Sequence, residues 1–225
     1  MKQTYLINEG NPRLLLFFAG WGTDETLFRH YRPEGCDFML CYDYRTLDFE
    51  AAGLARYEEI RVVGWSMGVW AATQCLAGQE CLSAVKSSVA INGTPWLADD
   101  RRGIPVAIYR GTLEGLSPVS LHKFLRRMCR DTVAFRSFLA ITPRRPLEEL
   151  RDELANAYAL FSQRPADSGF AWTQAVVGEN DRIVPPQNQL NAWREMDVPV
   201  RTTADAHYQE ELFAHYLQDG LWTNS

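Results

Sequence analysis

Several features that would place this 225-residue chain in other protein classes are missing. It has no apolar run of 18 residues, and its first ten residues, MKQTYLINEG, lack the charged-then-apolar pattern of a signal peptide, so we expect a soluble, cytoplasmic protein. The five cysteines are scattered without a CxxC pair and there are only four histidines, which disfavours a zinc site or a disulfide framework. The phosphate-binding patterns GxxxxGK[ST] and GxGxxG are also missing, which disfavours a nucleotide-binding enzyme.

Acidic residues outnumber basic ones over the whole chain, but one segment is strongly basic. The chain has a net charge of −5, which argues against a nucleic-acid-binding protein. Residues 121–145, however, contain a single acid, Asp131, and seven basic residues: Lys123, Arg126, Arg127, Arg130, Arg136, Arg144 and Arg145. A basic segment of this kind within an acidic chain calls for an explanation.

Apolar runs that alternate with helical patterns predict an α/β protein with a mainly parallel sheet flanked by helices. Runs such as LLLFFAG and AVVG are apolar at every position, as in strands covered on both faces. The strands are expected at residues 4–7, 13–19, 37–42, 60–64, 87–92, 106–109, 173–177 and 198–203. Helices are expected at residues 23–32, 49–57, 67–77, 186–196 and 209–217.

Residues 111–170 interrupt this rhythm. Leu121, Phe124, Leu125 and Met128 follow helical spacing, and a further helix is expected at 147–161, after the prolines at 143 and 146. We therefore expect a core made of residues 1–110 and 171–225, with 111–170 forming a helical lid over the carboxyl edge of the sheet.

Chemistry is first suggested by the pentapeptide Gly64-Trp65-Ser66-Met67-Gly68. It stands between an expected strand and an expected helix, and strand, GxSxG and helix in this order form a nucleophile elbow. Side chains at the two glycines would collide with the neighbouring strand and helix, so small residues are required there. The other interpretation is an ordinary strand-to-helix turn.

A serine nucleophile needs a base and an acid that orients the base, in the chain order Ser, Asp or Glu, His. Asp181 and His207 each follow an expected strand, at the edge where active sites of open α/β sheets form. Glu179 and Asp205 are alternative acids, and His215 is an alternative base inside an expected helix.

An oxyanion hole requires two backbone N–H groups. Met67 follows the serine and is one candidate, and Trp21 in LLLFFAGWGTDE is the other. The glycines beside Trp21 would allow its backbone to approach a substrate closely, although this turn could also serve only to connect a strand to a helix.

Taken together, these segments resemble the α/β-hydrolase family, and more narrowly the BioG type of pimeloyl-[acyl-carrier protein] methyl ester esterase. The resemblance rests on LLLFFAGWGTDE, CYDYR, VVGWSMGVWAA, AINGTP, GIPVAIYRGTLEGL and LHKFLRRMCRD, and the acid and histidine segments extend it to the C-terminus. It implies a Ser66–His207–Asp181 triad, an oxyanion hole at Trp21 and Met67, and hydrolysis of a methyl ester without metal or cofactor.

The resemblance also suggests a partner. Acyl-carrier proteins are acidic, so the basic lid would attract one to the site entrance. The residues expected to bind the carrier are Arg126, Arg127, Arg130, Arg144 and Arg145. Ion pairs with the acids at 148–153 are the competing explanation for these charges. A short-chain carboxylesterase, a thioesterase, or a non-catalytic binding protein on the same scaffold stays an alternative.

Overall fold

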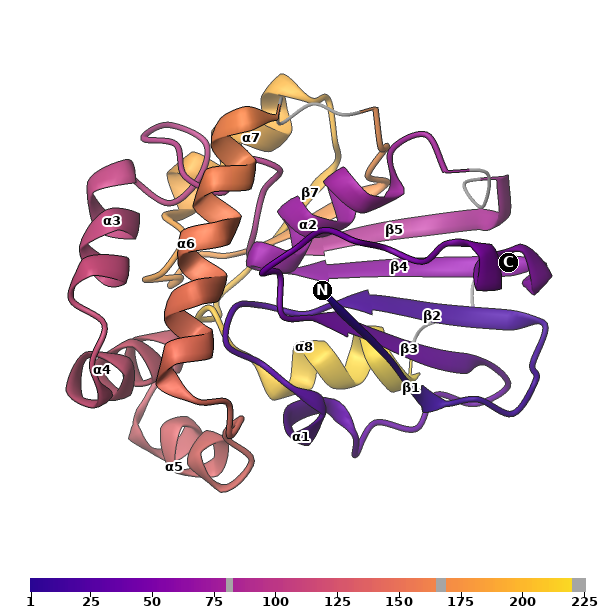
Figure 1. Ribbon diagram of the computed structural model, residues 1–225, viewed down its shortest axis with the longest axis horizontal. Helices are drawn as coiled ribbons and strands as arrows, with labels where there is room; N and C mark the ends of the chain where they lie inside the picture. The colour runs from indigo at the N-terminus through magenta and orange to yellow at the C-terminus, as the bar shows by residue number, and fades with distance from the viewer. Residues whose placement is uncertain (80–82, 165–168, 220–225) are drawn as a thin grey trace.

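One seven-stranded sheet organises the computed structural model, which describes residues 1–79, 83–164 and 169–219 (Figure 1). Cys81, one of the five cysteines, lies outside these ranges. The strands are β1 Lys2–Ile7, β2 Arg13–Phe18, β3 Asp37–Tyr42, β4 Glu59–Trp65, β5 Val85–Ile91, β6 Gln174–Gly178 and β7 Val200–Thr203. Their order is β1-β3-β2-β4-β5-β6-β7, and only the β1–β3 pairing is antiparallel. The mainly parallel α/β sheet predicted from the sequence is confirmed.

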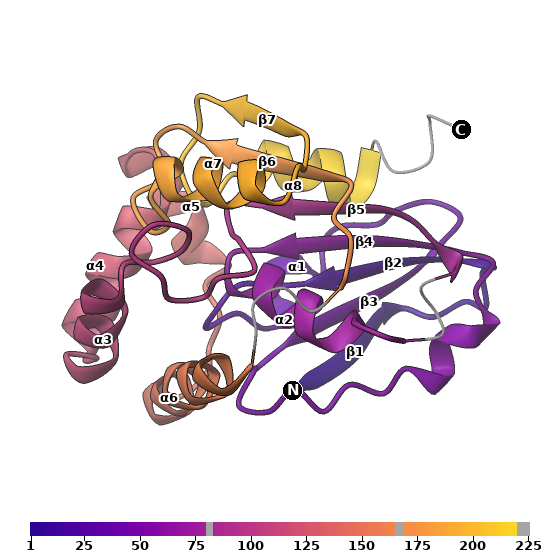
Figure 2. The same ribbon diagram turned by 90° about the horizontal axis from the view of Figure 1, so that it is seen from above.

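Helices cover both faces of the sheet because its central strands are apolar on both sides (Figure 2). On one face, Leu14, Leu16 and Phe18 of β2 share a core with Trp70 of α2 and Trp193 of α7. On the other face, the alternate residues of β2 belong to a second core with α1 and α8. The bounds are α1 Glu25–Phe28, α2 Met67–Leu76, α7 Pro186–Glu195 and α8 Glu210–Ala214, the last followed by a π-helical turn, His215–Asp219.

Four helices follow β5 and precede β6, at the carboxyl edge of the parallel strands (Figure 1). They are α3 Val106–Glu114, α4 Pro118–Met128, α5 Thr132–Ala140 and α6 Leu147–Gln163. The prediction of a strand at 106–109 is therefore wrong, because these residues form the start of α3. The inserted helices begin at Val106 rather than at residue 111. Strand β5 pairs directly with β6, which leaves no place for another strand between them. Tyr109 is instead buried against α6, where its ring stacks on that of Tyr158.

Two other expected helices are shorter than their patterns suggested. Of residues 23–32 only α1 is helical, and residues 49–57 contain a 3₁₀ helix, Ala52–Arg56, instead of an α-helix. The sequence patterns above do not predict α5, in which Phe135 and Phe138 are buried. Across the described residues, no helix combines the length and apolar character needed to cross a membrane.

Candidate active site

Ser66 occupies the sharp turn between β4 and α2. Its φ of 56° and ψ of −125° are strained for a non-glycine residue, as expected of a nucleophile elbow. The turn is crowded: a Cβ on Gly68 would lie 2.0 Å from the carbonyl oxygen of Phe18, and one on Gly64 would lie 2.7 Å from the ring of Trp172. Glycine is therefore required at both positions, at Gly68 because the backbone at the end of β2 is too close for a side chain and at Gly64 because the Trp172 ring is.

A continuous hydrogen-bonded chain connects Ser66, His207 and Asp181. The Nε2 atom of His207 lies 2.9 Å from Ser66 Oγ, and its Nδ1 atom lies 2.8 Å from Asp181 Oδ2. His207 and Asp181 are buried, with 1% and 5% of their surface exposed, whereas Ser66 is half-buried at the pocket. This geometry allows the imidazole to take a proton from the serine while the carboxylate fixes the ring.

Asp181 is held in place by three donors. Its Oδ1 atom accepts hydrogen bonds from the backbone N–H groups of Ile183 and Val184, at 2.8 and 3.0 Å. Its Oδ2 atom accepts a 3.0 Å bond from the side-chain amide of Gln189 on α7. The carboxylate is thus aimed at the imidazole by donors from the loop after β6 and from α7.

Hydrogen bonds from residues in and next to the sheet hold the backbone of His207 in place. Asn92, just after β5, donates from Nδ2 to the carbonyls of Ala206 and His207, both at 3.0 Å, and accepts from the Gly178 N–H at 2.7 Å. The indole N–H of Trp65 donates to the same His207 carbonyl at 3.0 Å. The roles of Asn92, Trp65 and Gln189 are not predictable from the sequence, because only the folded chain shows which distant carbonyls and carboxylates these side chains reach.

The alternative acids and base lie elsewhere. Glu179 is exposed and Asp205 is half-buried, and neither bonds to the imidazole of His207. His215 is exposed and packs against the neighbouring Tyr216 ring. In the part of the chain that the structure describes, no three His, Cys, Asp or Glu side chains gather as metal ligands.

Both expected oxyanion donors line the same pocket as Ser66. Met67 begins α2, so its N–H is one of the first in that helix and has no intrahelical acceptor. Trp21 lies in the loop after β2, and its side chain is 9% exposed and anchored by an indole hydrogen bond of 2.9 Å to the Leu150 carbonyl. The structure thus brings both residues to the serine.

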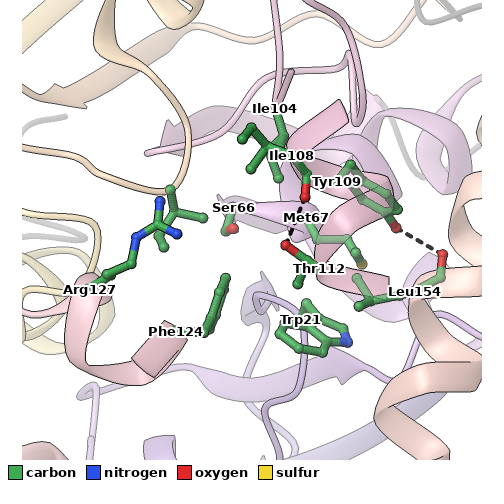
Figure 3. A pocket seen from close by; sticks show the side chains of 11 residues that line it. Trp21, Ser66, Met67, Ile104, Ile108, Tyr109, Thr112, Phe124, Arg127 and Leu154 are labelled. Atoms are coloured by element: carbon green, nitrogen blue, oxygen red, sulfur yellow. Dashed lines mark hydrogen bonds between the residues drawn. The ribbon is translucent and has the colours of Figure 1, made fainter. Parts of the chain in front are cut away.

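The pocket itself is narrow, about 40 Å³, and mostly apolar. Figure 3 shows Ser66 surrounded by side chains from the core and from the inserted helices. The lining residues are Trp21, Ser66, Met67, Ile104, Ile108, Tyr109, Thr112, Phe124, Arg127, Leu154 and Ile183. Burial raises the pKa of Tyr109 well above its ordinary value, so its hydroxyl stays protonated and donates to the Leu154 carbonyl at 2.9 Å.

An open groove between α3 and α4 continues from this pocket. Ile108, Thr112, Phe124 and Arg127 line both. The α3 side of the groove contains the small residues Ala107, Gly111 and Gly115, and the α4 side adds Ser120 and Lys123. A thin, linear molecule could therefore extend from Ser66 to the protein surface past two basic side chains.

The five arginines expected to bind a partner are not all at the surface. Arg127, Arg130 and Arg144 are exposed, and Arg126 is half-buried with its guanidinium 5.7 Å from the Phe135 ring centre. Arg145 differs, because its side chain is only 5% exposed and pairs with Glu149 and Glu153, as the competing explanation predicted. It also pairs with Asp43. Arg145 is therefore removed from the candidate carrier-binding residues.

Comparison with known proteins identifies the family. Residues 1–218 match the family model described as "Pimeloyl-ACP methyl esterase BioG". The chain is 49% identical over 203 residues to a malonyl-[acyl-carrier protein] O-methyltransferase of Bacteroides fragilis, covering 90% of this chain but only 41% of that protein's length.

Solved structures agree with this result. The crystal structure of BioG from Haemophilus influenzae superposes with a TM-score of 0.84 at 37% identity, over 97% of this chain and 100% of that one. An esterase from Exiguobacterium antarcticum shares the fold, with a TM-score of 0.64 at 12% identity over 92% and 87% of the two chains. The chain thus has the α/β-hydrolase fold, and it belongs to the BioG family, whose model is described as pimeloyl-acyl-carrier-protein methyl esterase.

Proposed function

We propose that this protein hydrolyses the methyl ester of pimeloyl-[acyl-carrier protein] to free pimeloyl-[acyl-carrier protein] and methanol in biotin biosynthesis. The observation that carries the proposal is the imidazole of His207, hydrogen-bonded to both Ser66 and Asp181 at the base of the apolar pocket. Membership in the BioG family supports this substrate, since the family model is described as "Pimeloyl-ACP methyl esterase BioG".

Acylation begins when Ser66 Oγ attacks the ester carbonyl carbon and His207 Nε2 takes the hydroxyl proton. Asp181 holds the imidazole in the required tautomer and stabilises its charged form. The negative charge on the former carbonyl oxygen is stabilised by the N–H groups of Trp21 and Met67. As the intermediate collapses, the bond to the methoxy oxygen breaks, and methanol leaves with the proton from His207.

Deacylation repeats the sequence with water. His207 takes a proton from a water molecule, whose oxygen attacks the carbonyl carbon of the acyl-serine. The bond to Ser66 Oγ then breaks, and His207 returns its proton to that oxygen. The products are the regenerated serine and a pimeloyl chain with a free carboxyl group, still attached to its carrier.

The groove between α3 and α4 suits a carrier-bound substrate. In this substrate the methyl ester and the carrier stand at opposite ends of the acyl chain, so the chain must extend from Ser66 to the surface. Lys123 and Arg127 line the groove, and Arg130 is exposed at the end of α4. We propose that α3–α6 act as a lid whose basic α4 surface receives the acidic carrier.

We also propose that the protein is located in the cytoplasm. Cys41, Cys75 and Cys129 are buried thiols outside any disulfide, which is the usual state of cysteines in a reducing compartment.

Substitution of the nucleophile tests the reaction. Ser66→Ala should abolish methanol release from methyl-pimeloyl-[acyl-carrier protein] while the thermal unfolding temperature stays near that of the wild type. A fluorophosphonate should label the wild-type serine and leave Ser66→Ala unlabelled. Substantial turnover by Ser66→Ala would disprove the assignment, and faster hydrolysis of p-nitrophenyl esters than of the carrier-bound ester would favour a general carboxylesterase.

Charge reversal tests the carrier surface. Lys123→Glu and Arg130→Glu together should raise KM for the carrier-bound ester at least tenfold, with little effect on p-nitrophenyl butyrate. Arg127 is unsuitable for this purpose, since it also lines the pocket around Ser66. Arg201→Glu, exposed on β7 at the far edge of the sheet, is a matched control. Equal effects on both substrates would remove the carrier-docking role of α4.

A further inference from the structure

A fully buried carboxylate links the lid to the loop that contains Trp21. Glu153 lies in the middle of α6, and its side chain is 0% exposed. Burial of a charge is costly unless the charge is paired and hydrogen-bonded, so the partners of Glu153 indicate which parts of the core it stabilises. It does not touch Ser66, His207 or Asp181, and the mechanism above does not use it.

Both oxygens of Glu153 accept hydrogen bonds from the backbone of the core. Oε1 accepts from the N–H of Tyr44, after β3, at 2.9 Å. Oε2 accepts from the N–H of Gly22, the residue after Trp21, at 3.3 Å. Oε2 is also paired with the Arg145 guanidinium at 2.6 Å, and another nitrogen of that guanidinium lies 2.9 Å from Asp43.

Three further contacts join the same loop, residues 20–24, to the same part of the lid. The indole N–H of Trp21 donates to the carbonyl of Leu150, one turn before Glu153 on α6. The backbone N–H of Arg144 donates to Asp24 Oδ2 at 2.9 Å. The Arg145 guanidinium also donates to the Thr23 carbonyl at 3.5 Å. The loop is thus held from the lid side at four residues, Trp21 itself, Gly22, Thr23 and Asp24.

We infer that Glu153 is a positioning residue that fixes the Trp21 loop, so that the Trp21 N–H is aimed at the carbonyl oxygen of the substrate. The inference rests on the proposed roles of Ser66 and Trp21. An oxyanion hole is effective because its donors are already in place when the charge develops. Glu153 supplies that rigidity through the neighbouring peptide of Gly22.

Glutamine cannot replace this carboxylate. A carboxylate can accept from Tyr44 and Gly22 at the same time, whereas an amide has one accepting oxygen and one NH₂ group. In either orientation of the glutamine side chain in Glu153→Gln, its NH₂ group faces the N–H of Tyr44 or of Gly22, so one of these two hydrogen bonds is lost. Glu153→Asp keeps the charge beside Arg145 but withdraws the carboxylate by one methylene group, which should break the longer bond to Gly22.

The test compares Glu153→Gln and Glu153→Asp with wild type, using p-nitrophenyl butyrate, a substrate that requires no carrier. Active sites are counted by the end point of fluorophosphonate labelling, so that kcat refers to folded enzyme. Glu148→Gln, on the exposed side of α6, is the matched control. We expect kcat to fall roughly 10–100-fold in Glu153→Gln and less in Glu153→Asp, with KM within about twofold of wild type and Glu148→Gln unchanged.

Each alternative outcome overturns the inference. If either Glu153 variant folds and keeps wild-type kcat per labelled site, the carboxylate is only structural, even where its unfolding temperature is lower. A rise in KM with unchanged kcat would indicate a role in substrate binding instead. Failure of the proposed function is distinguishable from these outcomes. If Ser66 is not the nucleophile, wild type itself shows neither labelling at Ser66 nor turnover, and if only the substrate is wrong, wild type is labelled but does not prefer the carrier-bound ester.

Discussion

The close packing of the elbow makes Gly68→Ala an informative substitution. Gly68 is the second residue of α2, and its Cα faces the end of β2. A Cβ built there would lie 2.0 Å from the Phe18 carbonyl oxygen and 2.6 Å from that of Ala19. Both obstacles are backbone atoms at the end of a central strand, so no side-chain rotation can relieve the overlap.

The size of the effect follows from these distances. An ordinary contact between carbon and oxygen requires roughly 3.3 Å, so the start of α2 must move by about 1 Å from β2. Overpacking of this kind costs roughly 1–3 kcal/mol of unfolding free energy. Ser66 precedes the helix and should move with it, and its 2.9 Å bond to His207 would stretch beyond hydrogen-bonding distance. A misplacement of about 1 Å can lower kcat by about 100-fold.

Urea unfolding and p-nitrophenyl butyrate hydrolysis measure the two effects. Gly53→Ala is the control, because a Cβ added to Gly53 would meet no atom within 4 Å and its φ is not positive. We expect Gly53→Ala to leave stability and activity near wild type and Gly68→Ala to lower both. A Gly68→Ala variant with wild-type stability and kcat would refute the argument that backbone contact positions Ser66.

Two other predictions concern polar groups outside the triad. Asn92→Asp should lower the unfolding free energy measured in urea by roughly 2–4 kcal/mol and should lower kcat, because a carboxylate cannot donate to the Ala206 and His207 carbonyls. An unchanged unfolding midpoint would contradict this. Burial favours a raised pKa for Asp37, but the hydrogen bonds it accepts from Asn11, Glu9 and Tyr57 lower its pKa below the ordinary value. The ionised Asp37 carboxylate should therefore stabilise the fold fully above about pH 4, and this stabilisation should be lost as pH falls through the lowered pKa. The difference in unfolding free energy between wild type and Asp37→Asn should thus become smaller in acid. A difference that does not change with pH would refute this.

Local patterns in the sequence predicted much of the framework. The sequence patterns located the seven strands to within about two residues. The signal is clearest for central strands such as β2, since a strand buried on both faces needs apolar residues at every position. The GxSxG elbow was predictable for the same kind of reason: only glycine fits where a strand and a helix pack backbone against backbone. The failure at 106–109 shows the limit, because the apolar run VAIY suits either a strand or one turn of a helix, and the direct β5–β6 pairing decided between them.

Chain order alone also predicted Ser66, Asp181 and His207 as candidates, but not their geometry. Hydrogen bonds of 2.9 and 2.8 Å join residues that are 141 and 26 positions apart, and local periodicity carries no information at such separations.

Only the tertiary structure decided which charges lie inside the protein. Arg145 and Arg130 are equally basic in the sequence, yet one is buried beside Glu153 and the other is 63% exposed. The physical reason is that burial of a charge depends on finding a partner from another element, which here is a carboxylate of α6 anchored to the core. The sequence determines which residues can carry chemistry, and the packing of the lid against the sheet decides which of them act on the substrate, on a partner or on one another.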